Sequence, residues 1–271
     1  MKTDDIKVLV LDIDGTLTNS KKEISEETKR GILEIQKRGH IVILASGRPT
    51  PGMKRYAEEL ELKRYGGYLL SFNGGSIIHA SSGSVVFQKV LPSIVIPNIY
   101  KFALDHQCGL MTYIGDTIIL GTAMDPYIEL ESRINQMEIK QVHNFLDYTE
   151  YDLNKCLMTA EPEKAEKLVK ILQEKYGNIL SIYRSEPFFI EIMPKNVDKA
   201  TSLDRMLQTV QLTRENTICV GDGFNDMTMI EYAGVGVAMA NAQPEVKRIA
   251  DFITKSNDED GIVTVIEKYI V

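Results

Sequence analysis

The chain has 271 residues, of which 44% are hydrophobic and 25% are charged, with a formal net charge of -7 and a pI of about 5.3. This length predicts one large or two modest domains, and the composition is typical of a globular protein. Because the balance is acidic and no run of Lys and Arg is present, we expect neither a nucleic acid nor a membrane as a partner.

The three cysteines lie far apart and none forms a CxxC pair, so we expect neither a disulfide framework nor a zinc site. The N-terminal segment MKTDDIKVLVLDIDG reaches acidic residues too early for a signal peptide. No stretch approaches the roughly 20 apolar residues of a membrane span. We therefore expect a cytoplasmic protein, and the sequence leaves open whether it is a monomer or a homodimer.

The first 60 residues alternate between strand-like and helix-like segments. Residues 6–12 and 40–46 are short apolar runs rich in β-branched side chains, which is typical of buried parallel strands. Residues 25–38, with Ser25 as the expected N-cap, and residues 51–60 have helical spacing. Strand and helix alternating at this pitch predict right-handed βαβ units and a parallel sheet.

The same alternation returns near the C-terminus. Residues 217–222 and 235–240 are predicted strands, while residues 199–210, 226–233 and 244–250 are predicted helices. We interpret these segments as the second half of the sheet that the N-terminus begins.

The middle of the chain has a different pattern. Four strand-like stretches, at residues 84–90, 110–122, 155–161 and 179–185, flank one predicted helix at 162–176. We therefore predict an α/β protein with a Rossmann-like, doubly wound parallel core built from residues 1–83 and 188–271 and an inserted α+β domain at 84–187.

Polar side chains follow the predicted strands of the core. Asp12 and Asp14 are separated by one residue, so on an extended backbone both carboxylates face the same way. Two such carboxylates repel each other unless a cation or a proton lies between them, and Mg²⁺ typically binds one or two carboxylates together with water and phosphate oxygens. Each residue alone could equally be a turn or cap residue.

Ser46 ends the second predicted strand, where a hydroxyl and exposed backbone N–H groups can bind a phosphate, although Ser-Gly is also a common loop dipeptide. Lys199 stands at the expected start of a helix, where the helix macrodipole disfavours a cation. Its position suggests an anionic partner such as a phosphate or an aspartate; the alternative is a solvated surface lysine.

The segment GDGFND at 221–226 supplies two further carboxylates and an amide beside two glycines. Asp222 follows a predicted strand and is placed to complete a metal site, because ligands of open parallel sheets bind outside the carboxyl ends of the strands. Asn225 and Asp226 could instead be N-caps of the helix that follows.

Other nucleotide and nucleophile motifs are not found. The chain has no GxxxxGK[ST] segment, so we exclude a P-loop. Gly234-Val-Gly236 lacks the third glycine of a dinucleotide fingerprint, and no G-x-S-x-G or Ser/His/Asp set is evident.

Taken together, these residues resemble the haloacid dehalogenase superfamily, and specifically its Cof-type phosphatases with an α/β (type IIB) cap. The four motifs of the superfamily occur in order along the whole chain: DIDGTL at 12–17, Ser46-Gly47-Arg48, Lys199 within EIMPKNVDK, and GDGFND at 221–226. FNGGSI at 72–77 resembles an Asn-Gly segment common in this subgroup. Ala200 stands where a glycine often follows the motif lysine, and Lys195-Asn196 replaces the usual glycine-containing turn, but neither departure changes a functional group.

The resemblance implies a role for each acidic residue. Asp12 would be the nucleophile that forms an aspartyl-phosphate, and Asp14 would protonate the leaving oxygen and then activate water. Mg²⁺ would be held by the Asp12 side chain, the Asp14 backbone carbonyl and Asp222, with Asp226 in support.

The resemblance also implies which residues bind substrate. Ser46, Gly47, Lys199 and Asn225 would bind the transferring phosphoryl group, whose charge must be stabilised in place. The inserted domain would be a cap that closes over the substrate and excludes water. The candidates for contacting the leaving group are Arg48, Asn73 and Arg184.

The function expected from the resemblance is hydrolysis of small phosphorylated metabolites, such as sugar phosphates or phosphorylated cofactors. A phosphotransferase or phosphomutase is an open alternative, because the same aspartyl-phosphate can be passed to a sugar hydroxyl instead of water. A third alternative is a non-catalytic regulator that binds a phosphometabolite. The sequence does not identify the substrate, since cap residues that would contact it follow no recognisable motif.

Overall fold

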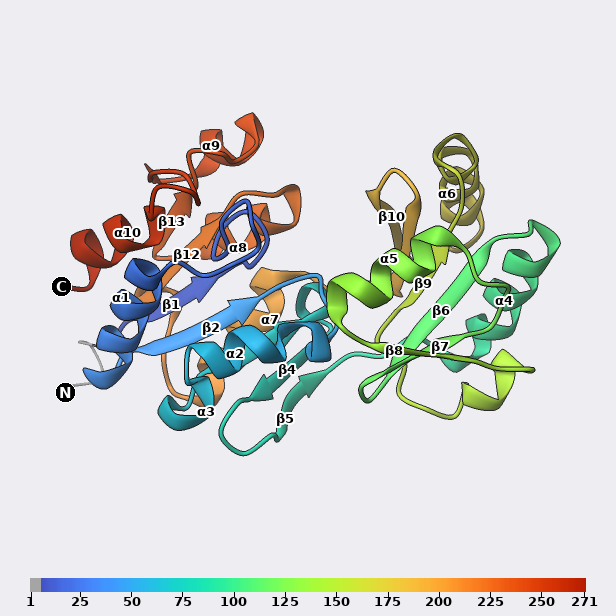
Figure 1. The fold of residues 1–271 in the computed structure, drawn as a ribbon, viewed down its shortest axis with the longest axis horizontal. Coiled ribbons are helices and arrows are strands. Elements are labelled where there is room, and N and C mark those ends of the chain that lie inside the picture. Colours follow the sequence, from blue (N-terminus) through green and yellow to red (C-terminus); the bar gives the residue numbers. More distant parts are fainter. Residues whose placement is uncertain (1–5) are drawn as a thin grey trace. The chain divides into compact units, whose positions relative to one another are not determined.

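The computed structural model describes residues 6–271, which form two compact units (Figure 1). The first unit extends to Phe87 and resumes at Asp198, and the second unit is Gln88–Val197. The first five residues, on which the expected absence of a signal peptide partly rests, lie outside the described part of the chain. Within residues 6–271, no helix has both the length and the apolar character needed to cross a membrane.

The first unit is built on a mostly parallel sheet. Its strands are β1 (Val8–Leu11), β2 (Ile41–Ala45), β3 (Tyr68–Ser71), β4 (Ser76–His79), β5 (Val85–Gln88), β12 (Thr217–Gly221), β13 (Val235–Ala238) and β14 (Phe252–Ile253). They lie in the order β14-β13-β12-β1-β2-β3-β4-β5. All pairs from β14 to β3 are parallel, and β4 is antiparallel to β3. The doubly wound parallel core that the sequence predicts is therefore confirmed.

The central strand of this sheet is β1. Its four residues are apolar and fully buried, as a strand covered on both faces requires. Leu11, its last residue, pairs in register with Leu44 of β2 and Val220 of β12. The carboxyl ends of these three strands are thus level, so the residues that follow them lie at one edge of the sheet.

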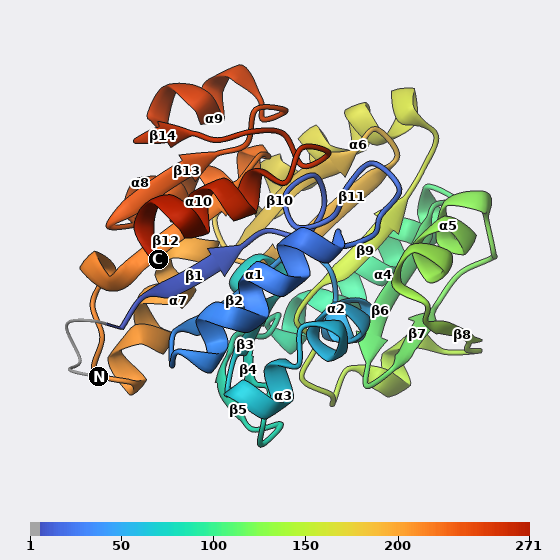
Figure 2. The ribbon, with the colours of Figure 1, turned by 60° about the vertical axis from the view of Figure 1, so that its left-hand side comes forward.

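Helices cover both faces of the core sheet. They are α1 (Glu26–Lys37), α2 (Lys54–Glu59), α3 (Leu62–Tyr65), α7 (Lys199–Thr209), α8 (Met227–Tyr232), α9 (Pro244–Ile249) and α10 (Gly261–Tyr269). In Figure 2, α1 and α10 lie side by side in front of β1 and β2, while α7 packs against α8 on the opposite face. The expected N-cap of α1 is present, because the hydroxyl of Ser25 accepts a hydrogen bond from Thr28 N at 3.1 Å.

The second unit is an α+β domain with its own hydrophobic core. Its strands are β6 (Gly109–Ile114), β7 (Thr117–Leu120), β8 (Glu138–Gln141), β9 (Cys156–Thr159), β10 (Leu180–Glu186) and β11 (Phe189–Pro194), and its helices are α4 (Ile96–Asp105), α5 (Pro126–Asn135) and α6 (Pro162–Tyr176). The sheet order is β10-β11-β9-β6-β7-β8, and only the pair β7–β8 among these neighbours is parallel. Alternate residues of β9 and β11 face α6, where Leu168 and Leu172 complete the core.

The bounds of the second unit, Gln88–Val197, differ from the predicted bounds of the inserted domain, residues 84–187. Residues 84–90 were expected in the inserted domain, but β5 lies at the edge of the core sheet, because a short turn after β4 returns the chain and His79 N donates to Ser84 O at 3.0 Å. At the other end, the second unit extends to Val197 because β11 pairs with β10 and β9.

Candidate active site

The buried ammonium group of Lys199 joins three segments that are distant in sequence. Its Nζ donates to Asp12 Oδ1 at 2.7 Å, to Asp226 Oδ1 at 2.6 Å and to the carbonyl of Ala45 at 2.8 Å. The side chain of Lys199 is 0% exposed, so this residue is not the solvated surface lysine considered as an alternative. The contacts explain why the sequence has a cation at the start of α7, where the macrodipole opposes it.

Electrostatics keep this lysine charged. Burial favours the neutral amine, but the carboxylates of Asp12 and Asp226 outweigh burial and raise the pKa of Lys199 above its usual value. The helix begins correctly despite the cation, because its N-cap Asp198 accepts a hydrogen bond from Thr201 N at 2.9 Å.

Asp226 is held in place by the turn that contains it. Its Oδ2 accepts hydrogen bonds from Asp222 N at 3.0 Å and Gly223 N at 2.9 Å, while Oδ1 contacts Lys199. These donors precede Asp226, so its side chain is not an N-cap of α8. A Cβ at Gly221 would lie 2.5 Å from the Cβ of Asp226, so only glycine fits the end of β12 here.

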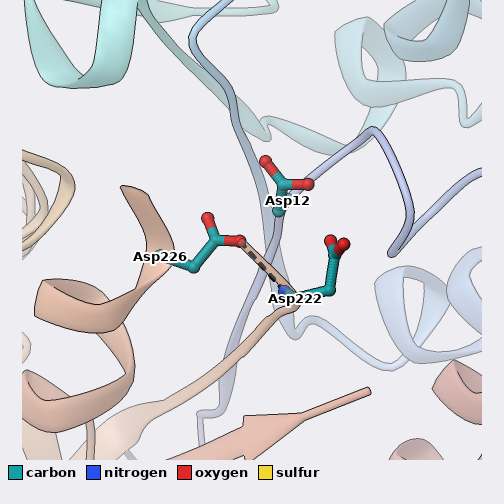
Figure 3. A group of neighbouring side chains, drawn as sticks. All are labelled: Asp12, Asp222 and Asp226. Atoms are coloured by element: carbon teal, nitrogen blue, oxygen red, sulfur yellow. Dashed lines mark hydrogen bonds between the residues drawn. The ribbon is translucent and has the colours of Figure 1, made fainter. Parts of the chain in front are cut away.

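Three carboxyl groups gather at the ends of β1 and β12 (Figure 3). Asp12, Asp222 and Asp226 each offer an oxygen, and these oxygens lie within 4.8 Å of one another. Burial, with the neighbouring charge of Asp226, raises the pKa of Asp12 despite Lys199. Burial likewise raises the pKa of Asp222 to about 6, against a hydrogen bond from Thr16 Oγ1 at 2.8 Å. A hard divalent cation would relieve this repulsion, so the donor set fits Mg²⁺.

Asp14 has cationic partners of its own. Arg48 donates to both of its carboxylate oxygens, from Nε at 2.7 Å and from Nη2 at 2.9 Å, and Lys22 Nζ donates to Oδ1 at 3.0 Å. Burial opposes ionisation of Asp14, but Arg48, together with Lys22, outweighs it and lowers the pKa to about 2. Asp14 is therefore ionised in this state, and Arg48 is bound to a carboxylate of the site.

Three of the expected phosphate-binding residues, Ser46, Gly47 and Asn225, lie close to Asn73. Asn73 N donates to the carbonyl of Ser46 at 2.9 Å, and Asn225 Nδ2 donates to Asn73 Oδ1 at 3.1 Å. A Cβ at Gly47 would lie 3.2 Å from the amide atoms of Asn73, so the backbone after Ser46 approaches that side chain closely. Asn73 itself has φ 51° and ψ 32°, in the left-handed region that asparagine adopts more readily than most residues.

Arg184 is the one expected site residue in the second unit. It lies on β10, where it is exposed and its Nη1 donates to Pro187 O at 3.4 Å. All the other expected site residues belong to the first unit.

The site includes residues that sequence reasoning missed. Thr16 donates to Asp222, Lys22 contacts Asp14, and Asn241 Nδ2 donates to the carbonyl of Gly15 at 2.8 Å. Thr16 stands inside the DIDGTL segment, so its place in that motif was a usable signal. Asn241 closely follows β13, and the rule that ligands lie at strand ends could have included it.

The chain belongs to the haloacid dehalogenase-like hydrolases, whose family model matches residues 9–266. Among curated proteins, it is 30% identical to the 5-amino-6-(5-phospho-D-ribitylamino)uracil phosphatase YcsE of Bacillus subtilis, over 98% of this chain and 97% of that protein. The Cof-type resemblance drawn from the motifs is thereby confirmed, and the family is one that includes phosphatases.

Solved structures give the same assignment. A haloacid dehalogenase-like hydrolase from Bacteroides thetaiotaomicron is 42% identical and superposes with a TM-score of 0.93, covering 97% of this chain and 99% of its own. A sugar phosphatase of subclass IIB, 22% identical, has the same fold with a TM-score of 0.83, covering 98% of this chain and all of its own. The fold is thus that of a type IIB member, in which an α+β domain is inserted into the chain of the core.

Proposed function

We propose that this protein is a Mg²⁺-dependent phosphatase that hydrolyses small phosphorylated metabolites through an aspartyl-phosphate on Asp12. The main support is the buried arrangement in which Lys199 bonds to Asp12 and Asp226 beside Asp222. It combines an oriented carboxylate nucleophile, a fixed cation and a set of metal ligands at one edge of the sheet.

In the first step, an oxygen of Asp12 attacks phosphorus and the bond from phosphorus to the leaving oxygen breaks. Lys199 orients the attacking carboxylate through the bond to Oδ1 and stabilises negative charge on the phosphoryl oxygens. Ser46, Gly47 and Asn225 would supply further donors to those oxygens. Bound Mg²⁺, held by Asp12, Asp222 and the backbone carbonyl of Asp14 with Asp226 in support, would neutralise charge shared by nucleophile and phosphate.

Asp14 would act as the acid and then as the base. It donates a proton to the leaving oxygen, and in the second step it takes a proton from the water that attacks phosphorus and releases Asp12. In the present state Arg48 and Lys22 keep Asp14 ionised, which is the form required of the base. To act as an acid, Asp14 must first exchange these cationic contacts for a proton, so Arg48 helps to determine its protonation state.

The proposed substrate class is supported by the chemistry of the site and by one relative. The site can bind a single phosphoryl group, and the relative YcsE is a phosphatase for a phosphorylated ribitylaminouracil, which is a small phosphorylated metabolite. Asn73 and Arg184 stay candidates for contacting the leaving group, and the second unit stays the candidate cap.

A panel of phosphorylated metabolites assayed with and without Mg²⁺ in isotopically labelled water tests this function. We expect Mg²⁺-dependent release of phosphate that contains one oxygen from solvent. Transfer of the phosphoryl group to an added alcohol, with no solvent oxygen in phosphate, would favour a phosphotransferase or phosphomutase. If no phosphorylated compound is turned over, a non-catalytic regulator would be favoured.

A further inference from the structure

The loop that follows β1 is held by side chains from near the C-terminus. Asn241 Nδ2 donates to Gly15 O at 2.8 Å, and Asn257 Nδ2 donates to Thr18 O at 2.8 Å. A third contact runs the other way, from Ser20 N to Asp258 Oδ1 at 2.8 Å. Residues some 220 to 240 positions apart are thus joined at three successive points of one loop.

The two asparagines also bind each other. Asn257 N donates to Asn241 Oδ1 at 3.0 Å, while the other half of the Asn241 amide donates to Gly15. Because one amide oxygen accepts and the amide nitrogen donates, the orientation of the Asn241 side chain is fixed at both ends. Asn257 therefore aligns the donor that contacts the loop.

Gly15 is the point of the loop at which a small displacement matters most. It follows Asp14 directly, and its backbone, at φ +87°, lies so close to Asp222 that an added Cβ would be 2.5 Å from Asp222 Oδ2. The next residue, Thr16, donates to the same carboxylate at 2.8 Å. A rotation of the peptide after Gly15 would therefore disturb both Asp14 and Asp222.

We propose that Asn241 is a positioning residue for the reaction of this site, and that Asn257 aligns it. By fixing the carbonyl of Gly15, Asn241 holds the backbone next to Asp14 against Asp222, so that both carboxylates keep their places. The proposal rests on the proposed phosphatase function. Displacements of about 1 Å at a catalytic group can lower rates by about a hundredfold, so one such hydrogen bond can matter to catalysis.

The chain offers a matched control for this role. Asn216 Nδ2 donates to the carbonyl of Ile6 at 3.0 Å, which is the same kind of bond at the opposite end of the β1 segment. A bond that merely stabilises the fold should have the same effect at either end. Only a positioning role should separate Asn241 from Asn216 in turnover.

The test compares Asn241→Ala, Asn257→Ala and Asn216→Ala with the wild type, using p-nitrophenyl phosphate and saturating Mg²⁺. We expect kcat of Asn241→Ala to fall by about tenfold to a hundredfold while KM changes by less than about threefold. Asn257→Ala should lower kcat less than Asn241→Ala does. It removes only the side-chain bond to Thr18, because the backbone N–H that binds Asn241 is kept. Asn216→Ala should lower the melting temperature about as much as Asn241→Ala does, but it should retain the kcat of the wild type.

Equal kcat values for folded Asn241→Ala and Asn216→Ala would overturn the proposal. If Asn241→Ala does not fold, Asn241→Asp replaces it, because aspartate keeps the size and the acceptor toward Asn257 but lacks the donor to Gly15. Its kcat must then fall in the same way. Failure of the phosphatase function itself would be recognised separately, as a wild type without activity or an Asp12→Asn variant with full activity.

Discussion

Each of the two units buries a lysine beside a carboxylate, and the two lysines occupy different places in their sheets. Lys199 lies at the carboxyl ends of parallel strands and bonds to Asp12 and Asp226. Lys155, whose side chain is 3% exposed, immediately precedes β9 and forms an ion pair of 3.1 Å with Glu191 on the adjacent strand β11. The ion pair of the second unit joins neighbouring strands, as a structural contact does. The ion pairs of Lys199 in the first unit instead join distant segments, beside carboxylates that could bind a metal ion. This arrangement is typical of a reaction site.

The strongest test of this difference removes the nucleophile. We expect Asp12→Asn to lower kcat by at least about 10³-fold, because an amide cannot attack phosphorus as a carboxylate does. Steady-state hydrolysis of p-nitrophenyl phosphate measures the effect. Asp251→Asn is the matched control and should keep its kcat. Asp251 Oδ2 accepts a hydrogen bond from Gly236 N at 2.8 Å near the start of β13, whereas the site lies at the carboxyl ends of the strands. Comparable activity in the two variants would refute the assignment of Asp12.

The second largest effect is expected from removal of the metal ion, which should affect the site around Lys199 and not the ion pair of Lys155 with Glu191. A chelator should lower activity by at least about a hundredfold, and Mg²⁺ should restore it. Mg²⁺ should also stabilise the wild type, by about 2.7 kcal/mol at a hundred times its dissociation constant, because it binds the folded carboxylate set. Asp222→Asn should weaken this stabilisation in thermal unfolding, whereas Glu191→Gln should leave it unchanged. Full activity in chelator would contradict the metal site.

Replacing either lysine should affect stability by a similar amount. Lys199→Met and Lys155→Met each leave a buried carboxylate group without a cationic partner. Each variant should therefore lower the free energy of unfolding by about 3–5 kcal/mol. Denaturant unfolding measures this loss. The folded forms of the two variants should nevertheless differ in activity toward p-nitrophenyl phosphate. Lys199→Met should be inactive, and Lys155→Met should be active. Loss of kcat in both variants would remove the distinction between the two units.

The smallest effect is expected when both members of the second pair are replaced. Lys155→Met with Glu191→Leu removes the charges together, so the free energy of unfolding should return to within about 1 kcal/mol of the wild type. Chemical denaturation of the single and double variants gives the coupling between the two residues. A double variant as unstable as the single ones would mean that other polar groups of the second unit depend on this pair.

Much of the site could be predicted because the rule for parallel sheets is geometric. Asp12, Ser46 and Asp222 follow strands whose ends are level, so their proximity follows from the fold alone. Lys199 was recognisable as a cation opposed to a helix macrodipole. The bond between Arg48 and Asp14 could not be predicted, since it depends on side-chain directions across two loops. Asn241 follows the end of β13, where the same rule could have included it, but a single asparagine after a strand is also commonplace in turns.

The fold shows the same limit at its edges. Residues 261–269 are rich in β-branched side chains, which favour strands over helices, and we predict no element for them from the sequence. They form α10 because Ile262, Val265 and Ile266 are buried on one face against α1, and this packing outweighs local propensity. The place of β5 in the core sheet was likewise decided by pairing with β4, which local sequence does not encode.

The central claim is that Asp12 accepts the phosphoryl group, and chemical trapping during turnover tests it most directly. Borohydride added in the steady state reduces an acyl phosphate, so the peptide containing residue 12 should carry homoserine at that position when examined by mass spectrometry. The modification should require both substrate and Mg²⁺ and should be absent from Asp12→Asn. Continued turnover with an unmodified Asp12, or a modified carboxylate elsewhere, would contradict the account.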